Sequence, residues 1–334
     1  MTLRSGLIIF FFTIACTSCW KKTTSKKPSS DTNKVLPSNT GNVSELVLVI
    51  SDELWSGKAG EIISDVLQEN IKAIPQQEAL FDIYNIEAKD FSSIYKTHKN
   101  ILWVSSSEKE AFERVDQMWS KDQLYIRLSN STEETLINNL KDHIYTIRSW
   151  FVDKDEQRRL QKLKTSADKE MQKQLQRSYE LSITIPKGYQ IASSEDNFIW
   201  LRKDSPKVNA VSNIWIHSEA YHSPEQFNKK NLIALRDSIG KTHVEGSRPQ
   251  SFMATEMLYD PDYKLIKKEP YTIETKGLWT MINDFLGGSY TAYAILDEEK
   301  QRIIYAEGFI YCPGERKRAH IFELEAILSG LELN

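Results

Sequence analysis

The chain has 334 residues, a formal net charge of -3 and 40% hydrophobic residues. This length suffices for two ordinary domains or one large one, and the hydrophobic content is high enough to form a core. Basic and acidic residues are interspersed along the sequence. This excludes the clustered basic face of a nucleic-acid-binding protein, so we expect no nucleic acid partner.

The first residues have the pattern of a secretory signal of the lipoprotein type. Arg4 is followed by an apolar run, residues 6–15, and then by Cys16 and Cys19. The run is too short to span a bilayer, which takes about 20 apolar residues. We predict a signal peptide over residues 1–18 and lipid attachment at Cys19, with Cys16 as the alternative. An ordinary or uncleaved signal peptide is the remaining interpretation.

Residues 19–43 are rich in Ser, Thr, Lys and Pro and predict a disordered tether. Its lysines favour a position facing the periplasm over export to the cell surface. We expect the protein in the cell envelope, anchored by lipid to the outer membrane. The membrane is thus one expected partner. Beyond the signal, Cys312 is the one cysteine in the sequence, so the globular part has no pair for an internal disulfide.

Residues 44–130 predict an N-terminal layered α/β domain. The apolar run 46–50 and the runs 81–86, 101–104 and 124–128 indicate strands, and the apolar residues between 62 and 71 have helical spacing. Residues 91–95 suggest a further short helix. Strand–helix–strand units of this kind are typical of a layered domain.

Residues 131–180 predict a long connecting helix. Ser131 and Thr132 provide an N-cap, and an apolar stripe runs from Leu136 to Leu175. The charged stretch between residues 153 and 164 allows a break near Asp153. We interpret the helix as crossing between two domains with a solvated charged face, and a coiled-coil partner site is the alternative.

Residues 181–334 predict a C-terminal domain with an antiparallel sheet and packed helices, which makes the whole chain α+β. Residues 198–202, 211–217 and 278–282 indicate strands, and the runs 290–296 and 303–310 flank a charged turn and predict a β-hairpin. Residues 224–239 and 315–331 have the spacing of amphipathic helices.

Several short motifs resemble those of an uncharacterised lipoprotein family of Bacteroidetes-type bacteria, domain of unknown function DUF4837. The motifs are spread over most of the chain: residues 52–57 (DELWSG), 74–78 (IPQQE), 198–202 (FIWLR), 235–238 (LRDS), 277–279 (GLW), 287–288 (GG), 307–311 (EGFIY), 317–318 (KR) and 324–327 (LEAI). Where the family pattern leads us to expect Gly-Gly-Pro-Phe, this chain has Gly-Gly-Ser-Tyr, which puts a rigid turn there in doubt. The resemblance implies a lipid-anchored envelope protein and no assigned activity. The third part is also similar to the Mog1/PsbP-like fold.

Motifs for metal or cofactor chemistry are weak, and we expect neither a metal nor a cofactor. His217, Glu219 and His222 approach a ligand set, but ordinary surface histidines explain them better. Gly57 and Lys58 do not form a phosphate loop, because no glycine lies five positions earlier. Together with Trp55 they are a candidate binding site at a helix start, where backbone N–H groups bind anions. A plain tight turn over a packed Trp55 is the alternative.

Two further clusters are candidate binding sites. Arg316, Lys317 and Arg318 form a basic turn at a helix N-terminus, where cations oppose the helix dipole, so they favour an anionic ligand or partner. A solvated first turn balanced by nearby glutamates is the alternative. Trp279 with Gly287 and Gly288 combines a large aromatic ring with glycines that allow close approach of a ligand, and core packing explains them equally well.

These patterns favour a non-catalytic envelope protein that binds an anionic or amphiphilic ligand, or an envelope protein partner, through its C-terminal domain. One alternative is an envelope hydrolase with Asp52, Glu53 or Asp237 as acid or base. Another is a structural scaffold of an envelope complex, held by the long helix.

Overall fold

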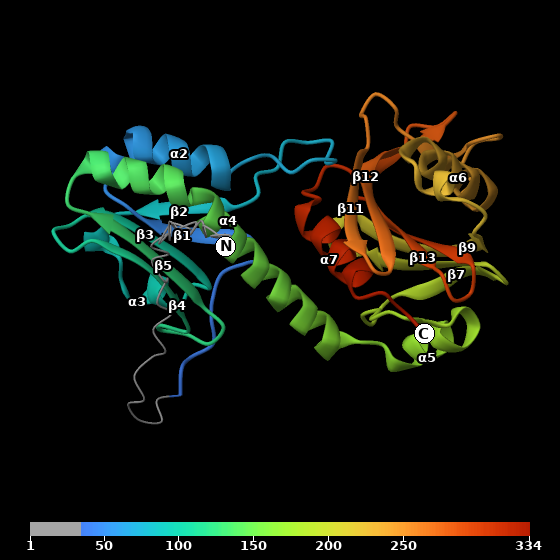
Figure 1. Ribbon diagram of the computed structural model, residues 1–334, viewed down its shortest axis with the longest axis horizontal. Coiled ribbons are helices and arrows are strands. Elements are labelled where there is room, and N and C mark those ends of the chain that lie inside the picture. Colours follow the sequence, from blue (N-terminus) through green and yellow to red (C-terminus); the bar gives the residue numbers. More distant parts are fainter. Residues whose placement is uncertain (1–34) are drawn as a thin grey trace, which may run out of the picture.

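The computed structural model describes residues 35–334 and places them in two domains joined by one long helix (Figure 1). The predicted signal peptide, with Cys16 and Cys19, lies outside the described residues, and so do residues 19–34 of the predicted tether. The prediction of a disordered tether is wrong for the residues nearest the domain, because Thr40 and Pro37 form backbone hydrogen bonds with it: the Thr40 N–H donates to the Thr97 carbonyl at 2.9 Å, and the Pro37 carbonyl accepts from the Lys121 N–H at 2.8 Å. The α+β class predicted from the sequence is confirmed. Among residues 35–334, no helix combines the length and the apolar character that crossing a bilayer requires.

The N-terminal domain contains a five-stranded sheet in the order β2-β1-β3-β5-β4. Neighbouring strands are parallel except for β4, which pairs antiparallel with β5. The sequence did not indicate β4, which lies at the sheet edge and alternates poorly in burial. The strands are β1 (Glu45–Val49), β2 (Asp82–Ile86), β3 (Asn100–Ser106), β4 (Ala111–Asp116) and β5 (Leu124–Asn130).

Helices cover both faces of this sheet, because its central strands are apolar on both sides. Leu46 and Leu48 of β1 belong to the core beneath α2 and α4, whereas Val47 and Val49 belong to the core on the opposite face. In Figure 1, α2 and α4 lie above the sheet and α3 lies below it. The helices before α4 are α1 (Asp52–Ser56), α2 (Lys58–Leu67), η1 (Ala88–Asp90) and α3 (Ser93–Lys96).

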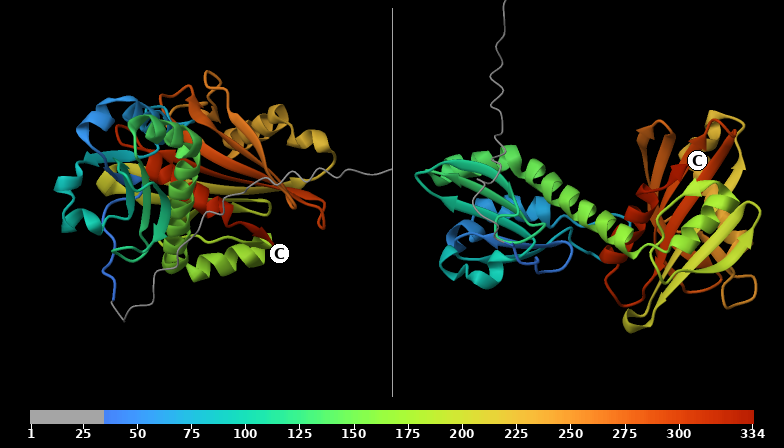
Figure 2. Two further views of the ribbon diagram at one scale, coloured as in Figure 1. Left: turned by 60° about the vertical axis from the view of Figure 1, so that its left-hand side comes forward. Right: turned by 90° about the horizontal axis from the view of Figure 1, so that it is seen from below.

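The connecting helix α4 (Glu133–Ser166) begins where the sequence predicts, since the Thr132 hydroxyl accepts a hydrogen bond from the Thr135 backbone N–H at 3.2 Å. It runs through Asp153 without a break and crosses from one domain to the other in both views of Figure 2. The break lies instead at Ala167, which is extended, and α5 (Lys169–Tyr179) follows with Asp168 as its N-cap. The expected single helix over residues 131–180 is thus two helices.

The C-terminal domain is built on an antiparallel sheet in the order β10-β12-β13-β14-β9-β8-β7, with β11 also paired to β12. The predicted hairpin is β13 and β14, and their neighbours are longer than the sequence indicated. The strands are β6 (Leu181–Ser182), β7 (Gln190–Glu195), β8 (Phe198–Ser205), β9 (Ala210–Ala220), β10 (Phe252–Thr255), β11 (Asp262–Lys268), β12 (Tyr271–Ile282), β13 (Gly287–Asp297), β14 (Arg302–Tyr311) and β15 (Glu332–Leu333).

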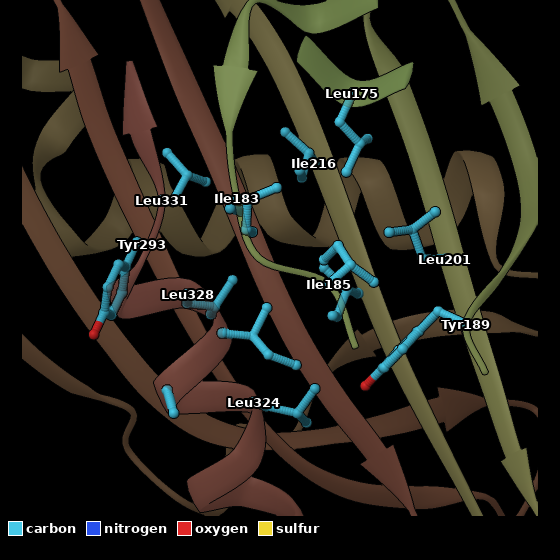
Figure 3. Packing of buried hydrophobic residues seen from close by; sticks show 14 of the residues in the cluster. Leu175, Ile183, Ile185, Tyr189, Leu201, Ile216, Tyr293, Leu324, Leu328 and Leu331 are labelled. Atoms are coloured by element: carbon cyan, nitrogen blue, oxygen red, sulfur yellow. The ribbon is translucent and has the colours of Figure 1, made fainter. Parts of the chain in front are cut away.

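Each face of this sheet has its own core. One core joins the sheet to α5 and α7 through residues such as Leu175, Leu324 and Leu328, which point toward the strands in Figure 3. The other core lies under α6 and includes Trp215 and Tyr290. Fully burying one leucine side chain in such a core stabilises the folded protein by about 1.5–3 kcal/mol. The helical elements are η2 (Pro206–Val208), η3 (Pro224–Phe227), α6 (Lys229–His243) and α7 (Arg318–Ser329).

Candidate functional site

The basic turn at the start of α7 lies against the N-terminal domain. The buried carboxylate of Glu78 accepts hydrogen bonds from the backbone N–H groups of Lys317 and Arg318, at 2.7 and 2.9 Å. Lys317 itself gives α7 no side-chain cap. A residue of the other domain therefore caps this helix, and the negative charge also suits the positive end of the helix dipole.

The side chains of the basic turn have partners in the same place. Arg316 donates two hydrogen bonds to Asp82, at 2.9 and 2.8 Å, and Arg318 donates one to Asp82 at 2.5 Å. Lys317 donates from Nζ to Gln76 at 2.6 Å. Burial alone would raise the pKa of Asp82, but the hydrogen bonds from the two arginines lower it below its ordinary value. These contacts hold the two domains together, and a ligand role for the basic turn stays a prediction.

A cleft of about 530 Å³ lies next to these contacts, between the two domains. An adjoining space of about 550 Å³ shares Leu80, Arg148 and Phe322 with it. Cavities of this size at domain interfaces are common ligand sites. We call the first space the interdomain cleft; its main lining residues are Tyr145, Val152 and Arg159 of α4, Lys276 of β12, and Phe322 and Glu325 of α7.

Two cations of the interdomain cleft, Lys276 and Arg148, have ion-pair partners. Lys276 contacts Glu325 at 2.7 Å and Glu274 at 3.3 Å. Burial alone would lower the pKa of Lys276, but the two carboxylates raise it above its ordinary value. Arg148 contacts Glu69 at 2.9 Å. The ammonium group of Lys276 is therefore favoured in its charged form, and both side chains are held in place by their partners.

Arg159 has no ion pair with a carboxylate among the described residues. Its Nε, like that of Arg148, is buried without a hydrogen-bond partner there. Its guanidinium carbon lies 4.8 Å from the centre of the Phe322 ring, which is a cation–π distance. Burial lowers the pKa of Arg159, while the charge of Asp155 opposes that shift. A buried donor without a partner costs free energy, so this guanidinium is suited to an incoming acceptor group.

The candidate residues near the start of the chain lie elsewhere. Trp55 is partly buried and packs against the core of the N-terminal domain. Gly57 precedes α2 as its N-cap, and Lys58 contacts Glu61 one turn later, at 2.5 Å. None of the three lines the interdomain cleft. Their proposed anion binding stays a prediction.

Trp279 and the glycine pair lie inside the C-terminal domain. Trp279 is 4% exposed and its indole N–H donates to the Ile310 carbonyl at 3.3 Å. Gly288 lies opposite Trp279 on β13, and a Cβ at Gly288 would come within 2.8 Å of the indole nitrogen. The close approach at Gly288 is between neighbouring strands and serves packing of β12, β13 and β14, as the alternative interpretation expects, and a ligand role for these residues stays a prediction. Gly287 is exposed at the start of β13.

The residues considered for metal binding and hydrolysis are not brought together. His217 Nε2 lies 3.9 Å from a Glu219 carboxylate oxygen, and residues 35–334 contain no group of three ligands close enough for a metal. Asp237 accepts hydrogen bonds from the Thr255 backbone N–H and hydroxyl, both at 2.7 Å. Asp52 and Glu53 lie on α1 of the other domain.

Two of the sequence motifs meet in the core beneath α6. Arg236 donates to Glu307 at 2.9 Å, and both side chains are almost fully buried. The Tyr305 hydroxyl donates to the other Glu307 oxygen at 3.0 Å. Burial raises the pKa of Glu307 to about 7, against the opposing charge of Arg236. This pair lines none of the cavities described here, and breaking it would leave a buried charge, which is strongly destabilising.

Sequence reasoning missed Glu78, Asp82, Arg159 and Lys276. The motif at residues 74–78 contains Glu78, but nothing in the sequence shows that it meets a helix about 240 positions later. Arg159 lies in the charged stretch that we interpreted as solvated. Only the folded arrangement shows that one side of this stretch faces a second domain.

The structure thus defines a two-domain α+β protein with a ligand-sized cleft between its domains. Comparison with family models matches residues 168–330 to the domain of unknown function DUF4837 and residues 39–164 to the domain of unknown function DUF8532. The resemblance to DUF4837 is therefore confirmed for the C-terminal part. The motifs at residues 52–57 and 74–78, which we had assigned to that family, fall in the second match instead.

The comparisons with individual proteins add little. No curated protein matches the chain. Among solved structures, the chain is similar to a point mutant of the protein Mog1 (8% identity, 46% of this chain, 90% of the other, TM-score 0.30) and to the Saccharomyces cerevisiae Ran-binding protein Mog1p (7%, 46%, 89%, 0.30). The human StarD13 (DLC2) lipid transfer and protein localization domain follows (13%, 43%, 89%, 0.24). The Mog1 likeness suggested by the sequence is thus found, but such TM-scores carry no argument about function.

Proposed function

We propose that this chain is a lipid-anchored cell-envelope protein of Bacteroidetes-type bacteria that binds an amphiphilic ligand in its interdomain cleft without chemically changing it. The lipoprotein-type start, with Cys19 as the acylated residue, supports the envelope location. The lysines that follow Cys19 support attachment to the outer membrane on the periplasmic side.

The single observation that carries the binding role is the interdomain cleft itself. Tyr145 on its α4 side is 67% exposed, so its ring is available to a ligand in the cleft. Phe322 provides a second ring on the α7 side, and Arg159 places a donor without a partner beside it. A ligand that fits this cleft would place an apolar part between the two rings and an anionic acceptor group at Arg159. Such a ligand is an amphiphile with an anionic end.

The charge pairs of the cleft favour binding over catalysis. A general base or nucleophile needs a pKa near the working pH, which for a lysine means a lowered pKa. The pKa of Lys276 is raised instead, because Glu325 and Glu274 stabilise its ammonium form. Lys276 is therefore suited to holding a ligand and unsuited to proton transfer.

The proposal is tested with dansyl-labelled undecanoic acid, a fluorescent anionic amphiphile. We expect saturable binding to the full-length protein and at least a five-fold weaker affinity in Tyr145→Ala, which removes a contact ring without disturbing a core. Tyr84→Ala is the matched control, because Tyr84 is 50% exposed on β2 and lines none of these cavities. Absence of saturable binding, or equal loss in both variants, would overturn the proposal.

A further inference from the structure

A second cavity, of about 310 Å³, lies on another side of α4, where this helix passes the C-terminal domain. Its cationic lining comes from three separate parts of the chain: Arg159 and Lys162 from α4, Lys187 from the segment before β7, and Lys203 from β8. We call this cavity the basic pocket. It shares Arg159 with the interdomain cleft.

The charges of the basic pocket do not balance. Its lining contains the four cations and one carboxylate, that of Glu323. Glu323 contacts Lys203 Nζ at 2.6 Å and so offsets one positive charge. Three positive charges remain around one cavity, and the Nε of Arg159 is buried without a partner among the described residues. Like charges brought together by folding repel one another unless an anion is present, so this arrangement costs free energy.

Buried apolar side chains form one wall of the pocket. Leu163 is 5% exposed, and Pro186 is buried beside Lys187. Val43, the last residue of the predicted tether, lies at the same cavity. Lys162 and Lys187 are exposed, so they can reach an anion that enters from solvent, and Arg159 is partly buried, where an anion is attracted more strongly than on an open surface.

We propose that the basic pocket binds a phosphate group. A phosphate monoester carries close to two negative charges at neutral pH and offers several acceptor oxygens, which matches the excess of cations over carboxylates in the lining. A guanidinium can bind two of these oxygens at once, and flexible lysines can adapt to the others. The phosphate is that of a lipid headgroup or of a soluble ester, since both present the same chemistry.

The position of Val43 relates this site to a membrane. If lipid is attached at Cys19, 18 positions separate it from Pro37, whose carbonyl accepts a hydrogen bond from the Lys121 backbone N–H, and the chain then follows the N-terminal domain to Val43. A segment of 18 residues spans at most about 65 Å, which allows the pocket to lie near the headgroups. The site does not depend on the proposed amphiphile in the interdomain cleft, because Lys162 and Lys187 line the basic pocket and not that cleft.

The test uses the full-length chain with Cys16→Ser and Cys19→Ser, so that an attached lipid does not dominate binding. Glycerol 3-phosphate is titrated by calorimetry, and vesicles of phosphatidylglycerol in phosphatidylcholine are tested by flotation. Lys162→Gln with Lys187→Gln is compared with Lys207→Gln and Arg177→Gln, an equal change of charge on exposed residues that line no described cavity.

We expect the pocket variant to weaken binding at least ten-fold and the control variant less than two-fold. The wild-type affinity falls as salt screens the charges. Binding of glycerol 3-phosphate that the pocket variant loses supports a soluble phosphate ester. Flotation with anionic vesicles that the pocket variant loses, without binding of the ester, supports a lipid headgroup. Absence of both, or equal losses in the two variants, overturns the proposal.

Discussion

At the scale of single residues, Glu78 resolves a conflict that the sequence presents. Arg316, Lys317 and Arg318 at the start of α7 oppose the helix dipole, which suggested an external anion. The structure supplies anions from the same chain, Glu78 for the backbone and Asp82 for the arginines. Lys317 and Arg318 are nearly buried, at 5% and 7% exposure. Replacing the three basic residues is therefore expected to destabilise the protein, whereas a solvated turn would tolerate it.

The Glu78→Gln substitution tests this arrangement most directly. The amide keeps one acceptor oxygen but turns an NH2 group toward the second backbone N–H, so one charge-assisted hydrogen bond is lost in a buried place. We expect the free energy of unfolding to fall by about 1.5–3 kcal/mol. Urea denaturation measures it. Glu170→Gln, in the exposed first turn of α5, is the control and should change stability by less than about 0.5 kcal/mol. Equal effects in the two variants would contradict the role of Glu78.

At the scale of elements, the sequence predicts what lies in a core and misses what lies at an edge. β1 and the hairpin of β13 and β14 have apolar runs, because each is buried within its sheet. β4, β7 and β11 lie at the sides of their sheets and contain no buried residue, so their sequences carry no clear alternation. Burial of one or both faces creates the apolar pattern of a strand. An edge strand that is held mainly by backbone hydrogen bonds therefore has fewer apolar residues.

The position of the break in the connecting helix also depends on contacts with residues distant in the sequence. The charged stretch around Asp153 suggested an interruption, but Asp155 is buried and accepts hydrogen bonds from the Ser44 backbone N–H and from Arg158. These contacts fix α4 to the start of β1 and keep the charged stretch helical.

The interdomain cleft could not be predicted from the sequence either. Its residues come from α4, β12 and α7, and local spacing does not show which distant elements meet.

The Gly288→Ala substitution tests the packing between strands. An added Cβ would lie 2.1 Å from the Ile310 carbonyl oxygen and 2.8 Å from the indole nitrogen of Trp279, so the two neighbouring strands would have to move apart. We expect destabilisation of about 1–3 kcal/mol, read from thermal unfolding followed by circular dichroism. Gly330→Ala, whose nearest neighbour would be 3.6 Å away, is the control. A Gly288→Ala variant as stable as the control would show that this contact is loose.

At the scale of the whole molecule, three features lie near one another: the contacts between the domains, the two cavities beside α4 and the point where the predicted tether joins. Val43 lines the basic pocket, and Ser44 donates to Asp155 of α4. With 18 positions between Cys19 and Pro37, a lipid anchor would keep the two proposed binding sites within reach of the membrane. This arrangement suits a protein that receives an amphiphile from a membrane, and it depends on which residue carries the lipid.

The Cys19→Ala substitution tests the anchor. Small residues precede Cys19, and the polar segment that follows leads into the folded part, so loss of this thiol should leave the protein without lipid and in the soluble periplasmic fraction. Labelling with radioactive palmitate and fractionation of the envelope measure both effects. Cys312→Ala is the control, because Cys312 is buried and should leave labelling unchanged. If Cys19→Ala still incorporates label and sediments with membranes while Cys16→Ala does neither, Cys16 is the acylated residue.

If both cysteine variants sediment with membranes, the protein would instead have an attachment to the membrane that needs no lipid. In that case the basic pocket, with its phosphate chemistry, is the first place to examine.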